Sequence, residues 1–305
     1  MRKALSHRLA AAVLCLFIGP AGAQTTLTSV GSDTLGELVQ AWAQAYAVQT
    51  PQVRFQIRTP GSAAAPTALA TGAADVGPMS RAMSAAELSD YRSRRGREPG
   101  RIRVAIDAVV VFVHPDNPLP ALRLEDAARI WSQDAACGGS PAVRWGDLGA
   151  HTGALASQTV LRLGRNTASG TFEFFHEAAL CRGHYRADVV QFPGAGAIVS
   201  AVAQMPSAVG YAGLGHVNGL VRVLPVAQGD GPAVMPDAAS VISGRYPLAR
   251  PLYLYFNRAD DGRPDPAIAG FLRFALSAPA QDIVARRGFV ALPAADVPLE
   301  SGQLQ

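Results

Sequence analysis

The chain has 305 residues, of which 49% are hydrophobic, and its Lys and Arg outnumber its Asp and Glu by 27 to 23. Three of the basic residues and none of the acidic ones lie in residues 1–23, which leaves 24 basic against 23 acidic residues in the remainder. This near-neutral balance excludes nucleic acid as an expected partner on charge grounds. The remaining stretch, about 280 residues, exceeds the usual size of one hydrophobic core and predicts two lobes.

The N-terminal segment has the pattern of a secretory signal peptide. A basic head, MRK, is followed by the apolar run LAAAVLCLFIG and by the small residues Ala21-Gly22-Ala23. We therefore predict a signal peptide at residues 1–23 that is cleaved before Gln24. Since no later apolar run approaches the ~18 residues of a membrane span, we expect a soluble, exported protein that is periplasmic or secreted outside the cell.

The following segments alternate between strand and helix patterns. TLTSV precedes a helix with an apolar face formed by Leu35, Leu38, Val39, Trp42 and Tyr46. VRFQIRT leads through a Gly-Ser-Ala turn to a short helix, and ADVGPM leads to a capping box, Ser84 to Glu87, that opens a charged helix. Further strand candidates are IRVAIDAVVVFVH, TVLRLGRN, VVQF, AVGYAG, LVRVLPVA and RPLYLYFN, and DPAIAGFLRFALSAPAQDIVARRG is helical.

This alternation predicts an α/β fold with mostly parallel sheets. The two longest strand candidates lie near residues 110 and 250, where each is long enough to pass from one lobe to the other. We therefore predict a two-lobed, periplasmic-binding-protein-like fold with a double crossover hinge. Lobe 1 comprises residues 24–110 and 250–305, and lobe 2 comprises residues 111–249. Such an architecture binds its ligand in a cleft at the strand ends.

Four small, hydroxyl-rich turns stand next to predicted helix starts: VGSDTLG (30–36), PGSAAAP (60–66), GPMSRAM (77–83) and GRNTASGTFEFF (164–175). Each turn could simply cap its helix, but helix N-termini also attract anions through their free N–H groups and dipole. Four such turns together favour binding of a tetrahedral oxyanion. Arg165 can donate to two of its oxygens, and Arg81 beside Ser80 is a second candidate cation.

Two cysteines, Cys137 and Cys181, follow the predicted signal peptide. In an oxidising compartment an isolated pair usually forms a disulfide, although two buried free thiols are the alternative. The spacing of Cys and His residues does not suit zinc, and we expect no metal or other cofactor.

In this order, VGSDTLGELVQAW, ADVGPMSRAMS, GRNTASGTFEFF, AVGYAGLG and YPLARPLYLYFN closely resemble segments of the phosphate-binding proteins of bacterial ABC transporters. The resemblance covers nearly all of the chain after the signal peptide. It implies capture of dehydrated inorganic phosphate between two lobes, by a monomer that delivers it to an ABC permease in the inner membrane. The segments around Cys137 and Cys181 also resemble the secreted subgroup that carries one disulfide. The predicted phosphate-binding residues are Ser32, Asp33, Thr34, Ser62, Ser80, Arg81, Arg165, Ser169, Gly170 and Thr171.

This sequence departs from the family's pattern at two of these positions, Ser80 and Asp33, and at Thr167. Many members carry an aspartate where Ser80 stands, and its carboxylate accepts the proton of phosphate. Many also carry an aspartate two residues after the site arginine, where this chain has Thr167, whereas Asp33 replaces a threonine of some relatives. We hypothesise that Asp33 has taken the acceptor role. It would then exclude sulfate, because an unsatisfied charged contact costs about 1–3 kcal/mol or more.

Three other functions stay open at this stage. A secreted, phosphatase-like hydrolase could pair Ser169 with His176, but the chain has no GxSxG or HExxH motif. An extracellular structural or adhesive protein on the same fold is the second alternative, although no repeat supports it. The third is a receptor for another oxyanion such as sulfate or molybdate, against which Asp33 argues.

Overall fold

The computed structural model describes residues 24–150 and 153–305, so the predicted signal peptide lies outside the described residues. The strands are β1 (Thr25–Val30), β2 (Val53–Arg58), β3 (Val76–Met79), β4 (Gly100–Val113), β5 (Leu122–Arg123), β6 (Leu161–Arg165), β7 (Val190–Phe192), β8 (Ala208–Gly213), β9 (Arg222–Val223), β10 (Val226–Ala227) and β11 (Ala249–Phe256). The helices are α1 (Gly36–Gln49), α2 (Ala64–Thr71), α3 (Ala85–Arg95), α4 (Leu124–Trp131), α5 (Gly170–Ala178), α6 (Ala195–Val202), α7 (Ala238–Ile242), α8 (Pro266–Ala275), α9 (Ala278–Arg286) and α10 (Val297–Gly302). None of these described helices combines the length and the apolar character that a membrane crossing requires.

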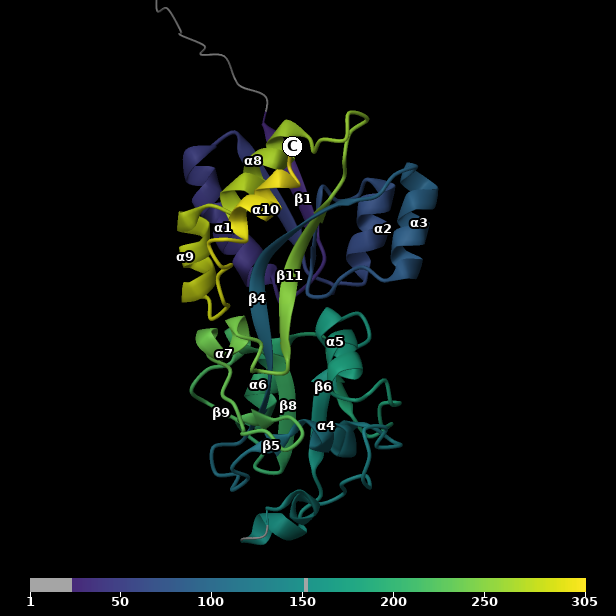
Figure 1. Cartoon of the computed structure of the whole chain (residues 1–305), viewed down its shortest axis with the longest axis vertical. Coiled ribbons are helices and arrows are strands. Elements are labelled where there is room, and N and C mark those ends of the chain that lie inside the picture. The colour runs from purple at the N-terminus through teal and green to yellow at the C-terminus, as the bar shows by residue number, and fades with distance from the viewer. Residues whose placement is uncertain (1–23, 151–152) are drawn as a thin grey trace, which may run out of the picture.

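The two lobes are joined by β4 and β11, which run from the upper lobe into the lower one (Figure 1). Nine strands form one sheet in the order β2-β1-β3-β11-β4-β8-β6-β7, with β9 added beside β4. Pairing is parallel among β1, β2 and β3 and again among β6, β7 and β8, but it is antiparallel along β4 and β11. The predicted two-lobed α/β fold with a double crossover is confirmed, and its parallel strands flank the antiparallel crossover.

Each lobe has its own hydrophobic core because both faces of the sheet are covered by helices. In the upper lobe, alternate residues of β11 point to opposite faces: Leu252, Leu254 and Phe256 pack with α1, α8 and α9, whereas Tyr255 packs with α2 and α3. Figure 1 shows these helix groups on opposite sides of the crossing strands. The predicted apolar face of α1 is buried there, and Trp42 Nε1 donates to Ala280 O at 3.0 Å.

The core of the lower lobe supports the helix that faces the upper lobe. Trp131, Phe175 and Tyr211 are fully buried, and the rings of Phe175 and Tyr211 stack with centroids 3.9 Å apart. Since Phe175 belongs to α5, this packing fixes the helix on the sheet. The disulfide between Cys137 and Cys181, with Cα atoms 5.4 Å apart, ties the segment just after α5 to the loop after α4. Closing a loop with a sequence separation of 44 stabilises the fold by about 3–4 kcal/mol on the chain-entropy model.

Candidate anion-binding site

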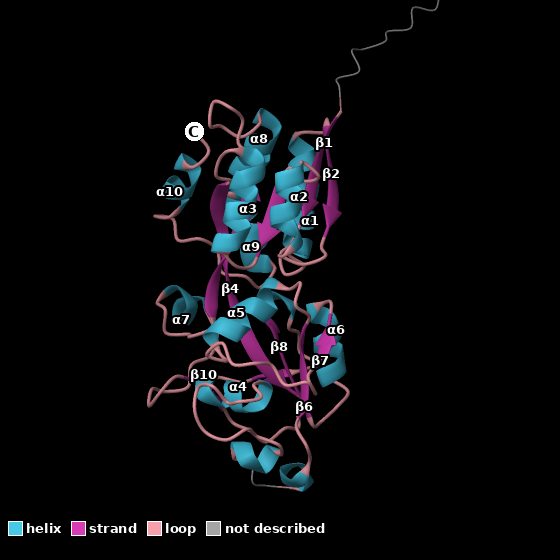
Figure 2. Ribbon diagram, turned by 90° about the vertical axis from the view of Figure 1, so that its right-hand side faces the viewer, coloured by secondary structure: helices cyan, strands magenta, loops and turns pink. Residues whose placement is uncertain are grey.

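The four predicted polar turns meet where the two lobes touch. In Figure 2, α5 lies at the top of the lower lobe, directly below the upper-lobe elements. Seven of the predicted polar side chains are at most 2% exposed here: Ser32, Thr34, Ser62, Ser80, Arg165, Ser169 and Thr171. Buried hydroxyl and guanidinium groups need hydrogen-bond partners, so a cluster of this kind is either a polar network or a ligand site.

The upper half of the site comes from the turns after β1, β2 and β3. Ser62 lies just before α2, and its Oγ accepts a hydrogen bond from the backbone N–H of Ser80 at 3.1 Å. The two serine hydroxyls lie 3.2 Å apart. The backbone N–H of Ser32 donates to Pro78 O at 2.8 Å, which joins the turn after β1 to β3. These bonds hold three hydroxyl-bearing turns side by side.

The lower half is the N-terminus of α5. Ser169 caps the helix, and its Oγ accepts from the backbone N–H of Thr171 at 3.1 Å. Gly170 touches the upper lobe so closely that a Cβ at this position would lie 2.5 Å from Ser62 Oγ and 2.6 Å from Ser80 Oγ. Only glycine therefore lets the first turn of α5 approach the upper hydroxyls. Thr171 Oγ1 reaches Thr34 Oγ1 across the lobes at 3.1 Å.

Arg165, the last residue of β6, is the cation of this cluster. Its Nη2 donates to Asp33 Oδ1 at 2.7 Å and to Pro193 O at 2.8 Å. Its Nε and Nη1 are buried and have no hydrogen-bond partner among the described residues. The backbone N–H of Arg165 donates to the hydroxyl of Tyr211 at 3.3 Å. Burial raises the pKa of Tyr211 to about 12, so this phenol stays neutral and holds the arginine in place.

Unpaired donors on a buried guanidinium indicate a ligand with acceptor oxygens. A guanidinium has five N–H donors and no acceptor, and leaving one of them buried without a partner costs about 1–3 kcal/mol or more. An oxyanion beside Nε and Nη1 would satisfy both donors at once. The geometry of Arg165 therefore favours an anion site over a purely structural ion pair.

Asp33 reaches this arginine from the other lobe. Its side chain is 14% exposed, and its Oδ1 pairs with Arg165 Nη2. Thr167, two residues after Arg165, has no carboxylate, and Asp33 supplies one to Arg165 from across the cleft. The predicted role of Asp33 as a proton acceptor stays a prediction, because this contact by itself explains a carboxylate at the position.

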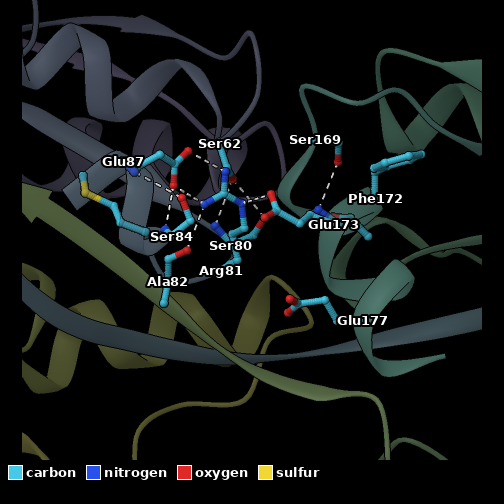
Figure 3. Close-up of polar contacts among 12 residues, drawn as sticks. Ser62, Ser80, Arg81, Ala82, Ser84, Glu87, Ser169, Phe172, Glu173 and Glu177 are labelled. Carbon is cyan, nitrogen blue, oxygen red and sulfur yellow. Dashed lines mark hydrogen bonds and ion pairs between the residues drawn. The ribbon is translucent and has the colours of Figure 1, made fainter. Parts of the chain in front are cut away.

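Arg81 lies beside the serine hydroxyls, but its donors are directed to carboxylates (Figure 3). Nη1 and Nη2 donate to Glu87 at 2.7 Å each, and Nε lies 2.5 Å from Glu173 of α5 in the other lobe. Glu87 also closes the capping box predicted with Ser84, which is confirmed. Burial alone would lower the pKa of Arg81, but the hydrogen bond and charge of Glu87 and the charge of Glu173 raise it. Arg81 thus bridges the lobes through ion pairs with Glu87 and Glu173, although its buried Nε makes no hydrogen bond among the described residues.

A second buried ion pair, between Asp107 and Arg250, was not predicted from the sequence. Asp107 on β4 and Arg250 on β11 are 0% and 2% exposed, and Arg250 Nη2 donates to Asp107 Oδ2 at 2.8 Å. The same Nη2 donates to Thr171 Oγ1 at 2.8 Å, which brings the pair to the anion site. The missed signal was a charged residue beside the apolar run of each crossing strand, Asp107 in β4 and Arg250 in β11. A buried charge in an apolar strand requires a partner.

A groove of about 780 Å³ lies beside the site, between α1, β2 and the start of α6. Of the predicted phosphate-binding residues in the described ranges, Asp33 alone lines this groove. The remaining site residues are enclosed between the lobes. Across residues 24–150 and 153–305, no group of three or more His, Cys, Asp or Glu side chains is suited to a metal ion.

Comparison with known proteins gives a consistent family. Residues 19–279 match the PBP superfamily domain. The chain is 40% identical over 275 residues to the phosphate-binding protein PstS of Pseudomonas aeruginosa, covering 90% of this chain and 85% of the relative. It is 27% identical to protein SphX of Synechococcus elongatus, over 96% of this chain and 86% of the relative.

Solved structures share the fold at lower identity. A substrate-binding protein of Clostridium perfringens with bound phosphate superimposes with a TM-score of 0.73 at 23% identity, covering 88% of this chain and all of that one. An ABC-type phosphate transport receptor from Vibrio cholerae gives a TM-score of 0.66 at 20% identity, over the same shares of the two chains.

Proposed function

We propose that this chain, which belongs to the PstS family of phosphate-binding proteins in the PBP superfamily, captures inorganic phosphate between its two lobes for an ABC transporter. The observation that carries the proposal is Arg165, whose buried Nε and Nη1 lack partners among the described residues. These donors point to an oxyanion held beside the N-terminus of α5. The name of the 40% identical relative supports phosphate as that oxyanion.

The residues proposed to bind phosphate come from both lobes. The upper lobe contributes Ser32, Asp33, Thr34, Ser62 and Ser80, and the lower lobe contributes Arg165, Ser169, Gly170 and Thr171. We leave Arg81 out of this set because its charge is paired with Glu87 and Glu173. We place the lobe boundaries near residues 110 and 250, where the crossing strands pass between the two cores.

Binding replaces the hydration shell of phosphate by fixed donors. Charge-assisted hydrogen bonds contribute about 1.5–3 kcal/mol each, and the hydroxyls and helix amides add weaker ones. Desolvation of the anion and closure of the lobes offset much of this sum, which leaves an expected dissociation constant of about 1 µM or lower. The lobes meet through contacts such as Thr34 with Thr171, so we propose that phosphate stabilises the form in which they touch.

The cellular setting is part of the proposal. A signal peptide at residues 1–23 would export the chain, and the Cys137–Cys181 disulfide is compatible with an oxidising compartment. A periplasmic or secreted monomer that delivers phosphate to a permease in the inner membrane fits both features. We propose that it acts as a receptor and not as an enzyme.

Calorimetric titration of ligand-stripped protein with inorganic phosphate tests the function. We expect binding at about 1 µM or tighter that persists in a large excess of sulfate. If excess sulfate abolishes phosphate binding, the proposed specificity for phosphate is overturned, but the protein is still a receptor for oxyanions. If neither anion binds, the proposal that this protein is an oxyanion receptor is overturned.

The hydrolase alternative finds no support in the geometry of His176. Its ring stacks against Phe172 of α5 and Tyr185 of the segment after α5, with centroids 6.4 and 5.8 Å away. Ser169 instead uses its Oγ to cap the helix. A chromogenic phosphate-ester assay is expected to show no turnover, and turnover lost in Ser169→Ala would favour the hydrolase.

A further inference from the structure

The two crossing strands place one ion pair at the floor of the anion site. Asp107 and Arg250 are register partners on β4 and β11, and Arg250 Nε and Nη2 donate to Asp107 Oδ2 at 3.1 and 2.8 Å. Gly213 on β8 leaves room for the carboxylate, since a Cβ there would lie 2.7 Å from Asp107 Oδ2. Three neighbouring strands are therefore shaped around this pair.

The pair is not fully satisfied by the protein. Asp107 Oδ1 and Arg250 Nη1 are both buried without a hydrogen-bond partner in the described part of the chain. A buried ion pair adds little net stability compared with apolar residues of the same volume, even when every polar atom is paired. Stability alone is therefore a weak reason for a buried Asp and Arg at the hinge.

The ion pair is linked to the anion site through Thr171. Arg250 Nη2 donates to Thr171 Oγ1 at 2.8 Å, and this oxygen lies 3.1 Å from Thr34 Oγ1. Because a guanidinium can only donate, the Thr171 oxygen accepts from Arg250. Its single hydroxyl proton must point elsewhere, to Thr34 or into the site. In either case the chain of hydroxyls ends in a donor, which is what an oxyanion requires.

We infer that Arg250, held by Asp107, is a positioning residue of the phosphate site that fixes Thr171 and Thr34 as hydrogen-bond donors to the anion. The inference rests on the proposed phosphate-binding function and names a residue that the four polar turns do not contain. It also makes the two crossing strands part of the binding machinery, because the donor pattern of the site is set from β4 and β11.

The local charges agree with an anion nearby. Burial lowers the pKa of Arg250, the charge of Arg165 lowers it further, and the charges of Asp107 and Asp33 oppose this. The two buried guanidinium groups are thus close enough to repel each other. An anion in the site would be attracted by both and would relieve that repulsion.

The test is phosphate titration of Arg250→Gln by calorimetry, beside a thermal unfolding scan. We expect phosphate affinity to fall about 10- to 100-fold, as for the loss of a hydrogen bond to a charged group. Arg162→Gln is the matched control, since Arg162 is equally buried but donates to the carbonyl oxygens of Ile130, Val160 and Ala142. It is expected to keep phosphate affinity within about threefold while lowering the melting temperature.

A double-mutant cycle with Thr171→Val separates a positioning role from an independent one. If Arg250 acts through Thr171, then Arg250→Gln adds little further loss in the Thr171→Val background. Additive losses would overturn the positioning role. Should Arg250→Gln fail to fold, the pair Asp107→Asn with Arg250→Gln removes both buried charges, and the same loss of affinity is expected.

Titration of the wild-type protein distinguishes failure of the proposed function from failure of this inference. Absence of phosphate binding by wild type would overturn the proposed function and the inference with it. Binding by wild type that persists unchanged in folded Arg250→Gln would overturn the inference alone.

Discussion

Two arginines of β6, Arg162 and Arg165, are buried to the same degree but differ in what surrounds their donors. Arg162 is 2% exposed and donates to the backbone oxygens of Ile130, Val160 and Ala142 and to Asp188. Arg165 is 1% exposed and spends Nη2 on Asp33 and Pro193, while Nε and Nη1 have no partner among the described residues. Burial and charge alone do not distinguish them.

This difference in hydrogen-bond partners indicates which of the two arginines binds a ligand. The donors of Arg162 join the loop after α4, the strand β6 and the end of α4 into one lobe, so this side chain serves the fold. Arg165 stands at the strand end, next to the N-terminus of α5 and opposite the other lobe. Its unsatisfied donors are a cost to the protein without an anion, and that cost is removed when an oxyanion binds.

Arg165→Gln is the strongest test of this contrast. Removing a cation that donates to two oxygens is expected to weaken phosphate binding by about a thousandfold, because two charge-assisted hydrogen bonds are lost. The fold should persist, since the substitution also removes two unpaired buried donors. Calorimetry with phosphate and a thermal scan measure both effects. Retention of affinity within about tenfold would contradict the assignment of Arg165.

Arg162→Gln should show the opposite pattern. It leaves several buried carbonyl oxygens without a donor, so we expect the free energy of unfolding to fall by about 2–4 kcal/mol. Phosphate affinity should stay within about threefold of the wild-type value, because Arg162 is not one of the residues proposed to bind phosphate. Denaturant unfolding and calorimetry measure the two quantities. An equal loss of affinity in both variants would mean that burial, not the unsatisfied donors, defines the site.

The sequence predicted the features that depend on local pattern. The apolar face of α1, the capping box at Ser84 and the two long strands follow from the period of apolar residues and from cap chemistry, and all three are confirmed. The four polar turns were also found from composition, because Ser, Thr and Gly next to a helix start either cap the helix or bind an anion, and four such turns together favour the anion. The structure brings these turns together between the lobes.

The pairing of charges could not be predicted in the same way. Arg165 and Asp33 are 132 positions apart, and Arg250 and Asp107 are 143 apart, so the partners meet only through the crossover of the chain. A single sequence gives no signal for such contacts. It does show that Asp107 and Arg250 stand in apolar strands, and that a buried charge there needs a partner.

Asp33→Asn sharpens the comparison by asking what the carboxylate opposite Arg165 does. If Asp33 accepts the proton of phosphate, the amide variant should lose about tenfold or more of its discrimination against sulfate. Phosphate affinity should fall less, because Arg165 remains. Competition calorimetry with both anions measures the ratio. A variant that still rejects sulfate as well as wild type would restrict Asp33 to holding Arg165.

Glu173→Gln concerns the ion pair that Glu173 of the lower lobe forms with Arg81 of the upper lobe. Burial raises the pKa of Glu173, and the charge of Arg81 opposes this without reversing it. A raised carboxyl pKa means that the ionised form is disfavoured where the lobes meet. The form in which the lobes touch therefore gains stability as the pH falls through the raised pKa of Glu173, and burial of the ionised carboxylate disfavours it at neutral pH.

The expected effect of this substitution is accordingly small. At pH 7, Glu173→Gln should bind phosphate as tightly as wild type or up to about threefold more tightly, since the pair is partly exposed. The difference should vanish below the usual pKa of 4.5, where the wild-type carboxyl is also neutral. Glu177→Gln on the same helix is the control for loss of a charge outside the contact between lobes, because its ion pair with Arg182 stays within the lower lobe; it acts on Glu173 only by lowering that carboxyl's pKa. Weaker phosphate binding in Glu173→Gln at pH 7 would instead show that the ion pair with Arg81 holds the lobes together.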